Sequence, residues 1–250
     1  MSSIDESLKL KLIKGSPLLL QKTNAFFLPK TVGEIIDFGY TDFLTIFHFF
    51  TLEKEDLKDF IQLPQVTVFF YFLLLLNNGP DSELSRIIQK GFYFFIGAEN
   101  LRPNLVDNNL LFDYNGITDI VMSEEGFAEL VQYINMVYNG GVAKEKEVPP
   151  QTEAERRFKE KFDRLRKERE AAKQKKGGNT NFSDMLGGYV VRNYNMTLQD
   201  VLNLPYYAFF FLLRKLQNYD EYDLQLRAML AGADVEDKLH HWISNTDDEE

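Results

Sequence analysis

The sequence predicts an α+β protein that is mainly α, with a helical, bundle-like body, a small N-terminal β-hairpin and a second short hairpin near residues 110–122. Apolar residues recur at three- and four-residue steps over most of the chain, whereas strand-like alternation is confined to those two places. The hydrophobic fraction of 44% is enough for a substantial core. We divide the chain into an N-terminal hairpin plus helical domain (1–142), a charged, net basic helical linker (143–182) and a C-terminal helical region with an acidic tail (183–250).

The N-terminal hairpin is predicted from alternation and turn signals. Residues 8–15 alternate well enough for a strand, with Leu8, Leu10 and Leu12 on one side. Residues 15–17, Gly-Ser-Pro, form a turn signal, and a further turn is expected at Thr23 and Asn24. Residues 18–28 would hold the returning strand or strands, which gives a hairpin or a three-strand unit.

Helix signals follow. Thr31 and Glu34 form a capping box, and the helix that they open is expected to break near Gly39. A short amphipathic helix is predicted at residues 57–61. Pro64 would open a buried helix ending at Leu76. Its apolar stretch, residues 66–76, is eleven residues long, whereas a membrane-spanning helix needs about 20. We therefore expect a core helix.

The middle of the chain combines one helix, one hairpin and another helix. Asp81 or Ser82 would cap a helix that ends at Gly97. Residues 110–122 read as a hairpin because Asn115-Gly116 is the favoured dipeptide of its tight turn. Ser123 would then cap an amphipathic helix that stops at residues 139–141.

The C-terminal region carries a long aromatic helix. Residues 197–200 form a capped helix start, and Pro205 suits the opening of a second helix. Five apolar residues then share one helical face, and Gly232 suits the helix end. The five are Tyr206, Phe209, Phe210, Leu213 and Leu216. Because consecutive helical residues lie about 100° apart, we expect Phe209 to face the core and Phe210 to face outward.

The charged segment between residues 151 and 176 has three readings. It holds 11 Lys and Arg against 6 Asp and Glu, on a narrow apolar stripe of Ala154, Phe158, Phe162 and Leu165. It can be a solvated linker helix, a protein-binding arm or a nucleic-acid-binding arm. The six acidic residues and the absence of Tyr and Trp disfavour nucleic acid, as does the acidic remainder of the chain.

The sequence contains no recognisable catalytic or metal-binding pattern. The chain has no Cys, which excludes disulfides, thiolate metal sites and a cysteine nucleophile. Its three histidines, His48, His240 and His241, have no metal-ligand spacing, and no glycine-rich phosphate loop or nucleophile elbow occurs. The polar, acidic first residues do not resemble a signal peptide. We expect a protein without catalytic residues, cofactor, metal, nucleic-acid or membrane partner.

Several segments together resemble the tail-assembly chaperones of long-tailed, siphovirus-like bacteriophages. The C-terminal block at residues 197–233, followed by LHHWIS at 239–244, is similar to the C-terminal region of that family. Residues 8–20 and 26–43 resemble its opening hairpin, proline and GEI…GY helix. The segments GFYFFIG (91–97) and GFAELVQYINMVYN (126–139) fit the same order.

The resemblance implies a chaperone that binds and solubilises the tape measure protein and helps the tail tube polymerise around it. The tail-tube protein and a second copy of the chain are further candidate partners. The expected location is the host cytoplasm during assembly, and not the mature virion. Candidate contact residues are Tyr206, Phe209, Phe210 and Leu213, with Arg156, Phe158, Phe162 and Arg166 of the basic segment.

Two other classes of function stay open at this point. One is a structural virion component, such as a tail-tube or head–tail joining subunit, which would be abundant in the mature particle. The other is a nucleic-acid-binding regulator acting through the basic segment, whose binding to random DNA would be salt-sensitive.

Overall fold

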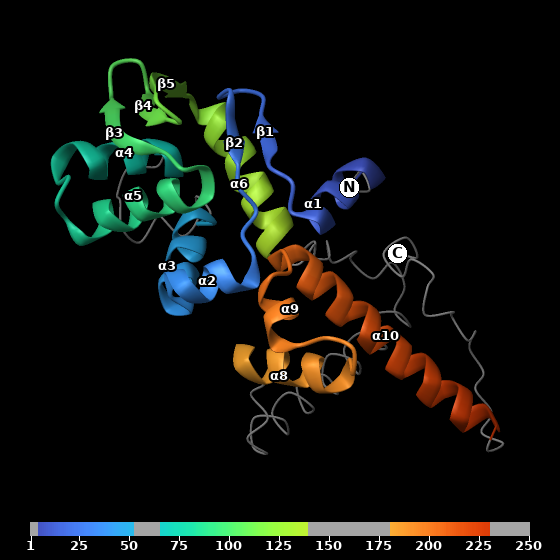
Figure 1. Cartoon of the computed structure of the whole chain (residues 1–250). Coiled ribbons are helices and arrows are strands. Elements are labelled where there is room, and N and C mark those ends of the chain that lie inside the picture. Colours follow the sequence, from blue (N-terminus) through green and yellow to red (C-terminus); the bar gives the residue numbers. More distant parts are fainter. Residues whose placement is uncertain (1–4, 53–65, 140–180, 231–250) are drawn as a thin grey trace, which may run out of the picture. The chain divides into compact units, whose positions relative to one another are not determined.

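The computed structural model describes residues 5–52, 66–139 and 181–230 (Figure 1). Helices dominate these residues, and two small antiparallel sheets accompany them, with strand orders β1-β2 and β3-β4-β5. The predicted fold class, α+β and mainly α, is confirmed. The helices are α1 (Glu6–Lys14), α2 (Val32–Phe38), α3 (Tyr40–Phe50), α4 (Val68–Asn78), α5 (Glu83–Ile96), α6 (Glu124–Tyr138), α8 (Phe182–Arg192), α9 (Leu198–Leu202) and α10 (Tyr206–Leu230). The strands are β1 (Leu18–Leu20), β2 (Ala25–Phe27), β3 (Glu99–Asn104), β4 (Asn109–Tyr114) and β5 (Ile117–Met122).

The chain forms two compact units. Unit 1 combines residues 1–141 with residues 202–250, and unit 2 consists of residues 142–201. The long helix α10 therefore belongs to the same unit as the N-terminal elements, although all of unit 2 separates them in sequence.

The strand predicted at residues 8–15 is wrong, because these residues form helix α1. In a strand Leu8, Leu10 and Leu12 would share one face, but Leu12 is fully buried while Leu10 is 57% exposed. Leu8 and Leu12 are four residues apart, so the same leucines also fit a helix. Gly15 ends α1 at a φ of 72°, and its N–H donates to the carbonyl of Leu12.

The N-terminal hairpin is real but lies one element later, in β1 and β2. The expected turn at Thr23 and Asn24 joins these strands, which pair Leu18 with Phe27 and Leu20 with Ala25. These four side chains are buried, and β1 contacts α6 (Figure 1). The carboxylate of Glu129 on α6 accepts the backbone N–H groups of Gln21 (3.0 Å) and Lys22 (3.1 Å). The Glu129 side chain thus connects the β1–β2 turn to α6 through two hydrogen bonds.

Glu129→Gln is expected to lower the free energy of unfolding by about 1 kcal/mol, since a hydrogen bond to a charged group is worth more than a neutral one. The amide keeps only one accepting oxygen, so one of the two N–H groups loses its partner. The matched control is Glu125→Gln, which removes only the exposed ion pair with Lys22 (3.4 Å) and should cost under about 0.5 kcal/mol. Urea unfolding of both variants measures the difference, and equal midpoints would contradict the fastening role.

The helix pair α2–α3 forms as predicted. The Thr31 hydroxyl accepts the N–H of Glu34, and the Glu34 carboxylate accepts the N–H of Thr31, which completes the capping box. Gly39 separates the two helices at a φ of 101°, a conformation that disfavours residues with a Cβ. The break expected near Gly39 is thereby confirmed.

The buried helix α4 begins later than predicted. Residues 66 and 67 are not helical, and Thr67 caps the helix by accepting the N–H of Phe70 (3.2 Å). A hydroxyl that satisfies a first-turn N–H sets the start here, rather than the proline expected to do so. Pro64 and the short helix predicted at 57–61 lie outside the described residues. Across the described parts of the chain, none of the helices has both the length and the apolar character to cross a membrane.

The elements from α5 to α6 are those predicted from the sequence, with one additional strand. Ser82 caps α5, Gly97 ends it with a φ of 68°, and Ser123 caps α6. The predicted hairpin is β4–β5, turning at Asn115 and Gly116, both with positive φ. The additional strand β3, which pairs with β4, was missed because Pro103 and two asparagines interrupt it.

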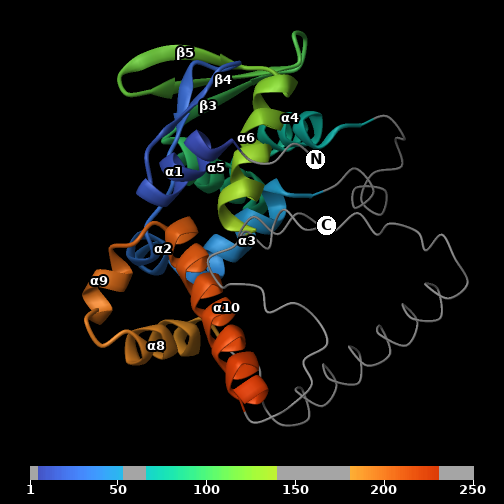
Figure 2. The same cartoon turned by 90° about the vertical axis from the view of Figure 1, so that its right-hand side faces the viewer.

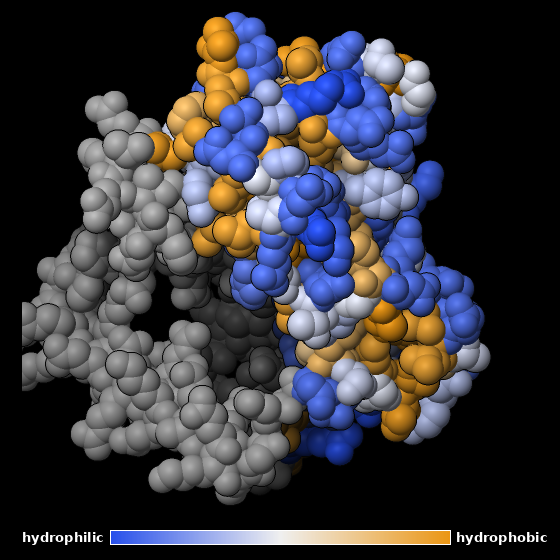
Figure 3. Space-filling view, turned by 90° about the vertical axis from the view of Figure 1, so that its left-hand side faces the viewer, coloured by the Kyte–Doolittle hydropathy of each residue, from blue (hydrophilic) through white to orange (hydrophobic). Residues whose placement is uncertain are grey.

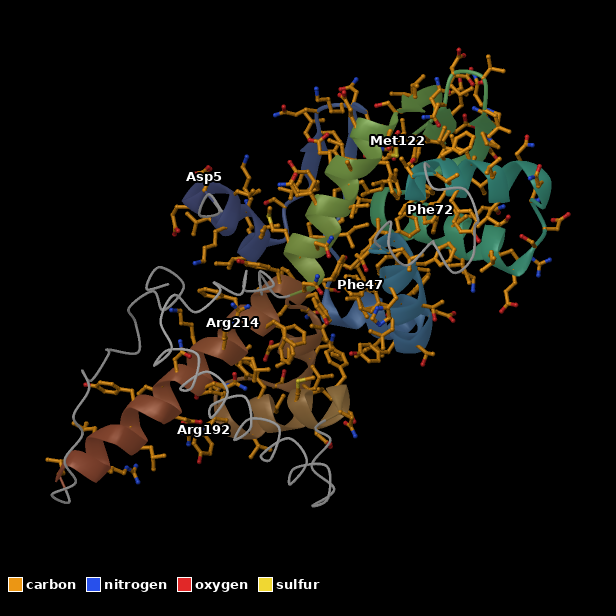
Figure 4. All side chains as sticks on the ribbon, turned by 180° about the vertical axis from the view of Figure 1, so that it is seen from behind. Asp5, Phe47, Phe72, Met122, Arg192 and Arg214 are labelled. Atoms are coloured by element: carbon orange, nitrogen blue, oxygen red, sulfur yellow. The ribbon has the colours of Figure 1, made fainter. Side chains whose placement is uncertain are left out.

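The core of unit 1 is largely aromatic. Phe50 lies at its centre, with ring centroids 5.0 Å from Phe92, 5.2 Å from Phe72 and 5.4 Å from Phe95. Figure 4 shows Phe47 and Phe72 pointing among the side chains of neighbouring helices. Most of these rings meet edge-on or tilted, the geometries that aromatic pairs prefer.

The C-terminal region contains the predicted capped helix, α9, which follows a helix that was not predicted, α8. In unit 2, Thr197 and Asp200 exchange hydrogen bonds at the start of α9, and Asn181 caps α8. In unit 1, α10 follows Pro205 as expected and continues without a break through the polar residues 217–223 to Leu230. Figure 2 shows its first turns beside α6 and the rest of the helix continuing away from it. Gly232, expected to end this helix, lies outside the described residues.

Candidate partner-binding surface

Backbone pairing fixes the start of α10 to the N-terminal half of unit 1. The N–H of Val32 donates to the carbonyl of Leu204, and the N–H of Tyr206 donates to the carbonyl of Lys30, both at 2.9 Å. These bonds flank a bridge between Thr31 and Pro205. The Pro205 ring lies so close to Gly15 that a Cβ added there would be 2.7 Å from the proline Cγ.

The first turn of α10 is buried on all sides. Tyr206, Tyr207, Ala208 and Phe209 are exposed by 6%, 6%, 2% and 0%. The ring of Tyr206 lies 5.3 Å from Tyr138 and 5.8 Å from Phe43. Two of the candidate contact residues, Tyr206 and Phe209, thus belong to the core and do not lie on an accessible surface. The core position expected for Phe209 is confirmed, but helix periodicity alone does not show that other elements cover the whole first turn.

Burial also determines the ionisation of Tyr138 and Tyr206. It raises the pKa of Tyr138 far above its ordinary value, although the hydrogen bond that its oxygen accepts from the N–H of Lys30 acts in the opposite direction. Burial raises the pKa of Tyr206 as well, with a smaller contribution from Tyr40. Both hydroxyls therefore stay neutral and serve packing and hydrogen bonding.

Beyond the first turn, residues 210–216 of α10 are half-buried and carry five large apolar side chains. They are Phe210, Phe211, Leu212, Leu213 and Leu216. Phe210 contacts the ring of Tyr206 at 4.6 Å and that of Phe209 at 5.1 Å. The ammonium of Lys9 on α1 lies 5.6 Å from the centroid of the Phe211 ring, and that of Lys215 lies 6.0 Å from it, within cation–π range.

The sequence interpretation omitted Phe211 and Lys9. The signal for Phe211 was present, because three consecutive phenylalanines must point in three directions about 100° apart on a helix. The sequence analysis assigns Lys9 to a strand, and that assignment gives no reason to expect Lys9 near α10.

The second half of the predicted contact set cannot be placed. Arg156, Phe158, Phe162 and Arg166 lie outside the described residues, as do His240 and His241. These assignments stay predictions. Figure 3 shows that, on one face of the described molecule, hydrophobic and hydrophilic residues are interspersed.

A connected polar cluster lies on the three-stranded sheet. The Arg102 guanidinium contacts Asp113 at 2.6 Å and Asp119 at 2.9 Å, and the Asn100 amide donates to Asp113 at 2.8 Å. Arg102, followed by Asn100, lowers the pKa of Asp113 to about 2. Each charge has a partner, and the cluster links the three strands. Among the described residues, no set of three or more acidic or histidine side chains is arranged to hold a metal.

Arg102→Ala is expected to raise the pKa of Asp113 from about 2 towards 3.8. Because the folded-state pKa is depressed, the stabilisation by ionised Asp113 is present above its unfolded pKa and is lost as the pH falls through about 2. The variant should therefore lose stability less steeply between about pH 4 and pH 2. NMR titration of the carboxyl carbons measures the pKa, with Lys90→Ala, which breaks a separate ion pair with Asp42, as control. An unchanged pKa of Asp113 would contradict this assignment.

Comparison with known proteins links the C-terminal region to phage proteins. Residues 172–247 match the family described as the YomV second domain, a family of Bacillus phage type. The match covers less than a third of the chain, including α8, α9 and α10. No curated protein and no solved structure matches the chain. The family match suggests that this is a phage-related protein.

Proposed function

We propose that this protein is a phage tail-assembly chaperone that binds the tape measure protein and keeps it soluble until the tail tube forms around it. The observation that supports this most is a coincidence of two signals in one region. The segment that resembles tail-assembly chaperones, residues 197–244, falls within the match to the phage-type YomV second domain.

The physical properties of the chain suit such a task. A tape measure protein is a very long helical chain with apolar stripes, and exposed apolar surface of that extent promotes aggregation. Aromatic side chains on a helix bind amphipathic helices by packing against their apolar faces. The chain offers Phe210, Phe211 and Leu213 half-buried on α10, while its net charge of −10 favours solubility. The function requires no catalytic residue, cofactor or metal.

The contact surface proposed here differs from the one predicted from sequence. Phe210 and Leu213 are retained and Phe211 is added, whereas Tyr206 and Phe209 support them from the core. The basic segment, with Arg156, Phe158, Phe162 and Arg166, is the second proposed contact. The tail-tube protein and a second copy of the chain are further proposed partners, with assembly in the host cytoplasm.

Co-expression with the tape measure protein tests the proposal. We expect the tape measure protein to remain in the soluble fraction and to co-purify with this chain. A control with Leu224→Asp, whose side chain is 69% exposed near the far end of α10, should behave as the wild type. If the tape measure protein sediments equally with and without this chain, the chaperone function is wrong. Abundance of the chain in mature particles would instead favour a structural virion component.

A further inference from the structure

The chain leaves unit 1 after α6 and returns to it before α10 at nearly the same place. Tyr138, at the end of α6, and Tyr206, at the start of α10, have ring centroids only 5.3 Å apart. Both side chains are buried, with 6% exposure each. Unit 2 is therefore inserted between two points that unit 1 itself holds together.

The returning segment is held by elements that precede the insertion. Its backbone pairs with residues 30–32, and Pro205 packs against Gly15. Tyr206 packs against Phe43 of α3, and α10 also contacts α1 and α6. None of these contacts requires a covalent connection through residues 142–201.

The two units also differ in charge. Residues 142–201 hold 14 Lys and Arg against 10 Asp and Glu, a net +4, whereas the rest of the chain holds 14 against 28, a net −14. A basic insert in an acidic protein is suited to partner contacts that unit 1 cannot make.

We propose that residues 142–201 are an inserted module, and that residues 1–141 and 202–250 form a complete fold that persists when the chain between them is cut. Unit 1 is then a two-piece structure, with α10 as the second piece. The two units can carry different partner contacts. Loss of the module leaves the proposed contact residues of α10, Phe210, Phe211 and Leu213, in place.

The experiment uses the full chain with two sites for a sequence-specific protease, one after Lys146 and one after Asn195. Asn195 is exposed between α8 and α9. After cleavage, we expect the fragments 1–146 and 196–250 to co-elute in size-exclusion chromatography at high salt, with helical circular dichroism retained. Because the fold has become bimolecular, its melting temperature should now rise with protein concentration, unlike that of the uncut chain.

Two variants of the cut protein make the test specific. Phe209→Asp should release the fragment 196–250, because it places a charge in the contact that holds the pieces together. Leu224→Asp should leave the fragments associated. Separation or aggregation of the otherwise unaltered fragments would overturn the proposal. It would favour the alternative that residues 172–247, the extent of the family match, fold as one continuous domain.

Discussion

Phe209→Asp is expected to unfold unit 1. The side chain of Phe209 is fully buried, and its ring packs edge-on against Phe210 at 5.1 Å. An aspartate there either buries an unpaired charge or leaves a large cavity with a protonated acid inside. The cost is several kcal/mol, a large share of the roughly 5–15 kcal/mol that stabilises a typical domain. Thermal melting followed by circular dichroism should show a transition lowered by more than about 10 °C, or none.

Phe210→Asp is the informative partner of that variant. Phe210 follows Phe209 in sequence but is half-buried, so a charge can reach water from this position at a modest cost. We expect a folded protein with a melting temperature close to that of the wild type. Loss of an aromatic contact residue typically costs about 2 kcal/mol or more of binding energy, so binding to the tape measure protein should fall at least 30-fold. Two variants that are both stable and both bind normally would remove α10 from the proposed mechanism.

The elements that the sequence predicted correctly are those with local chemical signals. The Thr31–Glu34 capping box, the Asn115-Gly116 turn and the serine caps of α5 and α6 all form as expected. Each depends on hydrogen bonds or backbone angles within four residues of chain, so no knowledge of the tertiary fold is needed.

The errors arise where distant contacts decide the outcome. Leu8, Leu10 and Leu12 satisfy both a strand and a helix pattern, and the contact of α1 with α10 favours the helix. The sequence predicted that Phe209 faces the core and Phe210 faces outward, but it could not show how completely the aromatic rings of the first turn of α10 are buried. Their burial depends on Phe43 and Tyr138, more than 60 residues away in the chain.

In unit 1, Gly91 of α5 lies directly against the ring of Phe50 of α3. A Cβ on Gly91 would overlap the Cε2 atom of the Phe50 ring and would lie 2.7 Å from its Cζ atom. The ring cannot withdraw easily, because Phe72, Phe92 and Phe95 surround it with centroids 5.0–5.4 Å away. Either the two helices separate or several aromatic rings leave their preferred geometry.

Gly91→Ala is therefore expected to destabilise the protein, although alanine is the better helix former. Higher helix propensity contributes about 1 kcal/mol in favour of alanine. Overpacking in a dense core costs about 1–3 kcal/mol and exceeds this when the neighbours are fixed, so we expect a net loss of about 2 kcal/mol in the free energy of unfolding. The matched control is Gly187→Ala on α8, where no described heavy atom lies within 4 Å of the added Cβ and stability should rise by up to about 1 kcal/mol.

A double-mutant cycle identifies Phe50 as the cause. Phe50→Leu alone should destabilise, but in the Gly91→Ala background the smaller side chain makes room for the added methyl group. The two changes together should then cost less than the sum of the single changes, with a coupling energy of about 1–2 kcal/mol measured by urea unfolding. Additive effects would mean that Gly91 is required for another reason. A Gly91→Ala protein as stable as the wild type would show that α3 and α5 can separate without loss of stability, contrary to the close packing of Gly91 against Phe50.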